Sequence, residues 1–139
     1  MVGATLVTMG AAIVIVGSAA PWLRTGRRRR SSFEVFGLVD RLGFSPSGPV
    51  GWAIRLWPLV PLLVILAAAL AWVAVSWSLP VALVAVSYAG GVAAVVAAVD
   101  DQALLVVEAG PLVTAAGATV ILIGAGCNAF VTVRGHAHP

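Results

Sequence analysis

Residues 56–75 read LWPLVPLLVILAAALAWVAV and contain no charged side chain. Three further stretches, residues 2–23, 81–99 and 111–133, likewise lack Asp, Glu, Lys and Arg. A helix rises 1.5 Å per residue, so about 20 residues span about 30 Å, the thickness of the hydrocarbon core of a bilayer. The pattern predicts an all-α fold: an integral membrane bundle of four transmembrane helices.

The overall composition agrees with a membrane protein. Hydrophobic residues make up 61% of the chain and charged residues 9%, whereas a soluble domain carries about 25% charged residues. Four spans occupy most of the 139 residues, so we expect a single transmembrane domain, residues 1–139, without a separate soluble module. No positive charge precedes the first stretch, and Pro21 would follow a cut after Ala20, so we expect a retained helix rather than a cleaved signal peptide.

Small residues recur at helical intervals inside the spans. Lipid tails are as apolar as Leu, so helices associate in a bilayer through close van der Waals packing, which small side chains allow. Two interpretations stay open: the small residues pack one bundle together, or one stripe faces outward and binds a second protein or copy. The predicted packing seam comprises Gly3, Gly10, Gly17, Gly90, Ala94, Gly117 and Gly124, and the third span adds a stripe of Ala85, Ala89, Ala93 and Ala97.

Tryptophans flank the second span. Trp52 and Trp57 lie at one end, and Trp72 and Trp77 lie towards the other. Indole rings favour the headgroup layer because their body is apolar and their N–H group is polar. We therefore interpret these four residues as a membrane-interface belt.

The connection between the first two spans, residues 24–55, is rich in arginine and contains a helix-start signal. Ser31, Ser32, Phe33 and Glu34 match a capping box, and apolar residues then follow at helical spacing from Val35 to Leu42. The pattern predicts a short amphipathic helix over 32–42 at the membrane surface. Seven of the eight basic residues of the chain fall in this connection: Arg24, Arg27, Arg28, Arg29, Arg30, Arg41 and Arg55.

Basic residues beside a span can bind anionic lipid, with about 1 kcal/mol for each residue near the surface. The predicted lipid or partner contacts are Arg27, Arg28, Arg29, Arg30 and Arg41. The alternative is that these arginines only set the orientation of the protein and that the helix only covers the end of the bundle.

The acidic loop, residues 100–110, falls on the same side of the predicted bundle as the arginines. It holds Asp100, Asp101 and Glu108, so pairing of Arg27–Arg30 with Asp100 or Asp101 is expected to be feasible. Cytoplasmic loops carry an excess of Lys and Arg, and this rule does not depend on net charge. It predicts that both loops are cytoplasmic and that both termini are outside.

Catalytic and metal-binding patterns are nearly absent from the sequence. Ser and Thr residues are isolated within spans, and His136 and His138 form a pair at the end of the chain without a nearby third ligand. No Asp, Glu, Lys or Arg lies at membrane depth, which argues against a proton-coupled pump. We expect no catalytic residues, no cofactor, no metal and no nucleic-acid partner. The single Cys127 lies in an apolar stretch, where it is expected to act as a small hydrophobic residue.

Two short segments carry a family resemblance. Pro21-Trp22-Leu23-Arg24, an Arg/Ser-rich loop, and then Val39-Asp40-Arg41-Leu42-Gly43-Phe44 resemble small uncharacterised four-span membrane proteins of high-GC Gram-positive, actinobacterial-type bacteria. The resemblance covers residues 21–44 and implies a multi-pass protein of the bacterial cell membrane. It also implies that the loop after the Pro-Trp pair is outside the cell, in conflict with the charge rule.

These observations lead to two hypotheses for function. The first is a non-enzymatic accessory or scaffolding subunit of a larger envelope complex, which docks through its Gly/Ala seams and its Arg-rich face. The alternative is a small protein that binds or translocates anionic lipid.

Overall fold

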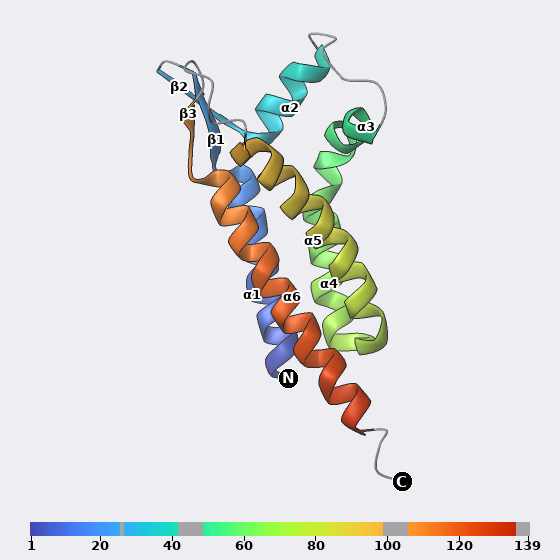
Figure 1. Ribbon diagram of the computed structural model, residues 1–139. Helices are drawn as coiled ribbons and strands as arrows, with labels where there is room; N and C mark the ends of the chain where they lie inside the picture. The colour runs from blue at the N-terminus through green and yellow to red at the C-terminus, as the bar shows by residue number, and fades with distance from the viewer. Residues whose placement is uncertain (26, 42–48, 99–105, 136–139) are drawn as a thin grey trace.

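The computed structural model describes residues 1–25, 27–41, 49–98 and 106–135 (Figure 1). These residues are mostly helical. Within these described ranges, three helical segments are long and apolar enough to cross a membrane: Val2–Ala19, Ile54–Val73 and Gly110–Thr132. A fourth apolar segment, Leu79–Ala93, is shorter. This arrangement is compatible with a helical membrane bundle.

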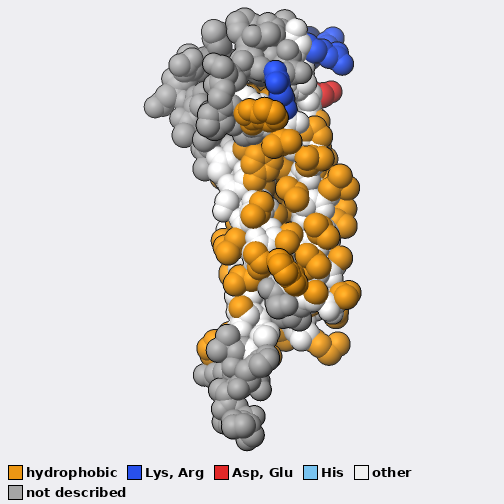
Figure 2. Space-filling model, turned by 90° about the vertical axis from the view of Figure 1, so that its right-hand side faces the viewer, with side chains coloured by type: hydrophobic (Ala, Val, Ile, Leu, Met, Phe, Trp, Pro, Cys, Tyr) orange, Lys and Arg blue, Asp and Glu red, His pale blue; other side chains and the backbone are white. Residues whose placement is uncertain are grey.

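Four helices form the shaft of the molecule. They are α1 (Val2–Ala19), α4 (Val60–Val73), α5 (Val75–Ala98) and α6 (Gly110–Gly135). Helices α1 and α5 each pack on both α4 and α6, so the four helices form a ring in which neighbours run antiparallel (Figure 1). Hydrophobic side chains cover most of the visible face of this shaft, whereas the coloured charges gather at one end (Figure 2).

The seam between α1 and α6 is built on small residues. Buried positions on α1 follow spacings of three and four residues, through Gly3, Val7, Gly10, Val14 and Gly17, which is the periodicity of coiled-coil packing. A Cβ atom at Gly10 would lie 2.8 Å from the carbonyl oxygen of Gly117. The backbones of α1 and α6 therefore approach too closely for any side chain at this point.

The other predicted seam positions behave in two ways. A Cβ at Gly17 would lie 2.7 Å from the backbone nitrogen of Thr114, and one at Gly124 would lie 2.7 Å from the carbonyl oxygen of Gly3. Gly90 of α5 is less crowded, because a Cβ there would meet the Cβ of Ala118 at 3.9 Å. The side chain of Ala94 lies outside the described residues.

Alanines fill the interior on the side of α4 and α5. Ala67 and Ala71 of α4 are buried, as are Ala85, Ala89 and Ala93 of α5. The alanine stripe predicted for the third span thus faces the core of this bundle, as far as Ala93. The side chain of Ala97 is outside the described part of the chain.

A small sheet, which the sequence patterns did not predict, lies at one end of the bundle. It has the strand order β2-β1-β3 and comprises β1 (Pro21–Thr25), β2 (Arg28–Ser31) and β3 (Val106–Val107), with antiparallel pairing throughout. The register between β1 and β2 shifts between Pro21 and Leu23. Such a bulge leaves one residue unpaired and re-aims its side chain, here Trp22, which is buried.

The ends of two predicted spans need correction. Helix α1 ends at Ala19 rather than at residue 23, because Ala20 precedes Pro21 and is extended, with φ −65° and ψ 163°. The gap between the second and third uncharged stretches, 56–75 and 81–99, predicts a turn over Ser76–Pro80, and this prediction is also wrong. The chain turns at Ala74, and Ser76–Pro80 already belongs to α5.

The belt interpretation is wrong for one of the four tryptophans. Trp57 is 0% exposed and lies in the core at the start of the second span. Trp52, Trp72 and Trp77 are each more than half exposed, as belt residues would be. The indole N–H of Trp72 also donates to the hydroxyl of Thr8 on α1, at 3.0 Å.

Candidate functional site

The end of the bundle that carries the sheet also carries two short helices. Helix α2 (Ser32–Arg41) follows β2 directly, and α3 (Pro49–Leu56) leads through the 3-10 turn η1 (Trp57–Leu59) into α4. The start of α1 and the end of α6 lie at the opposite end (Figure 1). We call the assembly of β1, β2, β3, α2 and α3 the head.

The start of α2 has the predicted capping box. The backbone N–H of Ser31 donates to Oε2 of Glu34 at 3.0 Å, and the backbone N–H of Glu34 donates to Oγ of Ser31 at 3.5 Å. These reciprocal bonds satisfy backbone groups that the first helical turn leaves unpaired. The prediction that a helix starts here is confirmed.

An open hollow of about 670 Å³ lies between β2 and α2. We call it the arginine hollow. Four of its lining residues are basic and one is acidic, and Phe33 and Leu38 are exposed on it. The complete lining is Arg28, Arg29, Arg30, Phe33, Glu34, Gly37, Leu38 and Arg41.

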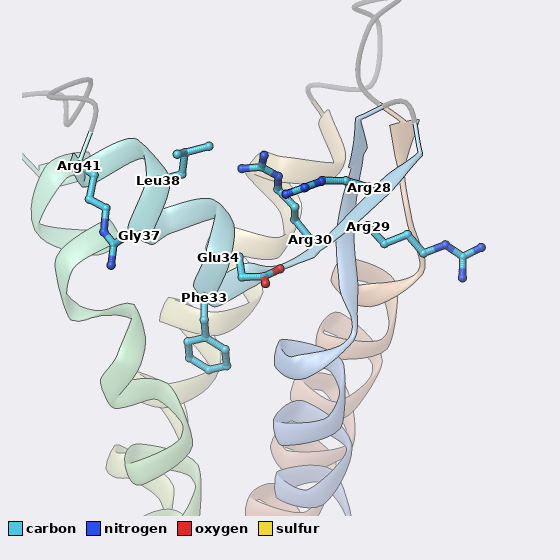
Figure 3. Close-up of a pocket in the computed structure, with 8 residues that line it drawn as sticks. All are labelled: Arg28, Arg29, Arg30, Phe33, Glu34, Gly37, Leu38 and Arg41. Atoms are coloured by element: carbon cyan, nitrogen blue, oxygen red, sulfur yellow. The ribbon is translucent and has the colours of Figure 1, made fainter.

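Strand geometry decides where the arginines of β2 point. Successive side chains of a strand project to opposite faces, so Arg28 and Arg30 share one face and Arg29 occupies the other. Arg28 and Arg30 extend over the space towards α2, whereas Arg29 points away from it (Figure 3). Arg28, Arg30 and the carboxylate-bearing Glu34 therefore line the same hollow from β2 and from the start of α2.

Arg29 is engaged on the far side of the sheet. Its Nε atom lies 3.5 Å from Oε1 of Glu108, and the Arg29 side chain is 64% exposed. A surface pair of this kind contributes no more than about 1 kcal/mol. The predicted partners Asp100 and Asp101 lie outside the described residues.

The five predicted contact arginines thus divide into three groups. Arg28 and Arg30 project over the arginine hollow from β2, and Arg41 lines it from the end of α2. Arg29 lines the hollow but also pairs with Glu108. Arg27 lies in the turn between β1 and β2, is exposed, and is not among the lining residues.

Beneath the head lies an aromatic cluster that the sequence patterns did not reveal. Trp57 is at its centre, with ring centroids 5.0 Å from Trp22, 5.1 Å from Phe36 and 6.0 Å from Tyr88. These distances fall in the range of favourable aromatic pairs. The four residues come from β1, α2, η1 and α5, so the cluster holds the head on the bundle. In the sequence, Trp22 and Trp57 lie near the ends of predicted spans, whereas Phe36 lies in the connection and Tyr88 within the third span, so no local pattern joins them.

Hydrogen bonds join the cluster to the end of α1. The indole N–H of Trp57 donates to Oγ of Ser32 at 2.8 Å, and this hydroxyl donates to the carbonyl oxygen of Ser18 at 2.6 Å. The indole N–H of Trp22 donates to the carbonyl oxygen of Gly17 at 2.8 Å. The last carbonyls of α1, which have no partner within the helix, are therefore satisfied by side chains of the head.

The other polar groups of the described residues include potential metal ligands and hydrogen-bonding side chains. Within the described ranges, no three His, Cys, Asp or Glu residues are grouped as metal ligands would be. His136 and His138 lie outside these ranges. Asn128 is 8% exposed, and its Nδ2 atom has no hydrogen-bond partner among the described residues. Cys127 is exposed on α6 rather than packed in the core.

Comparison with known proteins adds no assignment, because no family model, curated protein or solved structure matches this chain. The arginine hollow is therefore interpreted from its own chemistry.

Proposed function

We propose that this chain is a non-enzymatic membrane protein that binds an anionic lipid headgroup in the arginine hollow. The observation that carries the proposal is the placement of Arg28 and Arg30 over an open hollow that Arg41 also lines, at one end of an apolar bundle. Guanidinium groups bind phosphate through pairs of parallel hydrogen bonds, and they are more weakly hydrated than ammonium groups. The phosphate group of a lipid is thus a ligand that complements these arginines.

Two further features favour a lipid over a free anion. Phe33 and Leu38 line the same hollow as the arginines and are exposed, so they can contact the apolar part of an amphiphile. Strand pairing orders the backbone of two of the arginines, with Leu23 opposite Arg30 and Thr25 opposite Arg28. The backbone that carries these side chains therefore does not have to become ordered when a ligand binds, which lowers the entropic cost of binding.

In this proposal α2 acts as an interfacial helix and the head faces the cytoplasm. The cytoplasmic leaflet is rich in anionic lipid, and the excess of arginine at this end favours the same side. The bundle crosses the bacterial cell membrane with four helices, α1, α4, α5 and α6.

The accessory-subunit role is the second candidate. The close-packed glycines of α1 and α6 are used within the bundle and leave no room for a partner. Gly91 of α5 and Gly126 of α6, however, have no atom within 4 Å of an added Cβ position. A partner helix could approach the backbone there. Copurification of a stoichiometric protein in mild detergent would favour this candidate.

Lipid retention tests the first proposal. The protein is purified in mild detergent and the bound phosphatidylglycerol and phosphatidylcholine are counted by native mass spectrometry. We expect phosphatidylglycerol to be preferred. The double variant Arg28→Gln/Arg30→Gln should weaken that preference by roughly thirtyfold, at about 1 kcal/mol for each basic residue.

Arg27→Gln is the matched control, because Arg27 belongs to the same arginine run but does not line the hollow. It should change the preference by much less than the double variant. Equal retention of the two lipids by the unmodified protein would refute the proposal.

A further inference from the structure

We infer that one acyl chain of the bound anionic phospholipid lies in a second hollow beside α2. This inference rests on the proposed headgroup site. The second hollow has a volume of about 220 Å³, and we call it the apolar hollow. Its lining is Phe33, Phe36, Gly37, Ile54, Arg55, Trp57 and Pro58.

The two hollows share a boundary on α2. Phe33 and Gly37 line both of them, and these residues are four apart, so they follow one another along a single stripe of the helix. Glu34 and Leu38 line only the arginine hollow, and Phe36 lines only the apolar one. A ligand that crosses this stripe would contact both hollows.

At Gly37 the space between the two hollows is not blocked by a side chain. An added Cβ at this position would have no atom within 4 Å. Phe33, the other shared residue, points down from α2 alongside the bundle (Figure 3). The helix surface at Gly37 therefore carries no side chain that would block the space between the two hollows. An extended acyl chain can pass over the helix at this position.

The apolar hollow lies where the apolar segment of the second span begins. It is lined by residues at the start of the apolar segment Ile54–Val73. Pro58 is followed at four-residue intervals by Leu62 and Leu66, which are 62% and 48% exposed. A chain that leaves the hollow past Pro58 would thus continue along the lipid-facing side of α4, while its phosphate stays with the arginines.

The apolar hollow would fix the position of the acyl chain but would add little to the affinity of the protein for the lipid. In water each buried methylene group would strengthen binding about fourfold, but in a bilayer the chain is already in apolar surroundings. Binding should therefore depend little on chain length. The direct evidence to seek is contact between the chain and the apolar hollow.

Photo-crosslinking tests this contact. The protein is reconstituted in nanodiscs with phosphatidylglycerol that carries a diazirine in the upper part of one acyl chain, and labelled residues are mapped by mass spectrometry. We expect labelling to concentrate on Phe36, Ile54 and Pro58. The matching phosphatidylcholine probe should label these residues at least tenfold less.

A large side chain at position 37 should close the passage between the two hollows. Gly37→Trp should reduce labelling of the three residues at least tenfold, whereas Gly37→Ala should leave it unchanged because a methyl group meets open space. Ile54→Trp fills the same hollow from α3 and should reduce labelling of Phe36 and Pro58 at least tenfold.

Failure of the acyl-chain inference and failure of the headgroup proposal would give different results. If labelling spreads evenly over exposed positions such as Leu62 and Leu66 and does not respond to the two Trp variants, the acyl-chain inference is wrong. The headgroup proposal still stands in that case if phosphatidylglycerol retention depends on Arg28 and Arg30. If the anionic preference is absent altogether, both are wrong.

Discussion

At the scale of single residues, the closest helix contact depends on glycines that face each other across α1 and α6. Gly10→Ala would place a methyl group 2.8 Å from the carbonyl oxygen of Gly117. Overpacking of this kind costs typically about 1–3 kcal/mol. We expect a lower free energy of unfolding by this amount, measured by denaturant titration in detergent and followed by circular dichroism.

Gly126→Ala is the control for this measurement, since an added Cβ there meets nothing within 4 Å. It should be neutral, or stabilising by up to about 1 kcal/mol because Ala is the better helix former. Equal effects of the two substitutions would contradict the assignment of Gly10 to a close backbone contact.

Ser32 links α2, η1 and the end of α1 through its side chain. Its buried hydroxyl accepts from Trp57 and donates to the carbonyl of Ser18. Ser32→Ala leaves two buried groups unpaired, so we expect a loss of about 1–3 kcal/mol in unfolding free energy. A double-mutant cycle with Trp57→Phe should give a coupling energy of about 1 kcal/mol. Strictly additive single effects would exclude the hydrogen bond as a stabilising contact.

At the scale of elements, α2 has one side against the bundle and one side open. Phe36 is half-buried in the aromatic cluster, whereas Glu34 and Leu38 are exposed. Single cysteines placed along 33–38, after replacement of Cys127 by Ala, should react with a water-soluble maleimide at a helical period. We expect fast labelling at position 38 and slow labelling at position 36. Uniform labelling across the segment would be incompatible with a packed helix.

At the scale of the whole molecule, the open question is which way the protein crosses the membrane. The head carries the arginine excess, so we expect it to be cytoplasmic, with the start of α1 and the end of α6 outside. An alkaline phosphatase fusion after Pro139 should be active. Fluorescence from a reporter that matures only in the cytoplasm would reverse the orientation and place the arginine hollow outside, as the family resemblance implies.

Features that depend on composition and local spacing could be predicted from the amino-acid sequence. Uncharged stretches predicted apolar helices because a helix satisfies its own backbone hydrogen bonds in lipid. Ser31 and Glu34 predicted the start of α2 because both partners of a capping box lie within four residues. Gly10 and Gly17 are predicted to be close-packing positions because a spacing of seven residues keeps them on one side of a helix.

Features that join residues far apart in the chain depend on how the helices and strands pack, so local sequence patterns could not predict them. The bulge at Trp22 depends on pairing of β1 with both β2 and β3, and Leu23 is 84 positions away from its partner Val107 along the chain. Trp57 has the residue type and the position in the sequence that are typical of a belt residue. It is nevertheless buried, because Trp22, Phe36 and Tyr88 surround it. The arginine hollow also depends on the tertiary structure. The run of arginines was evident, but strand alternation and the position of α2 separate Arg28 and Arg30, which extend over the hollow, from Arg29, which pairs with Glu108.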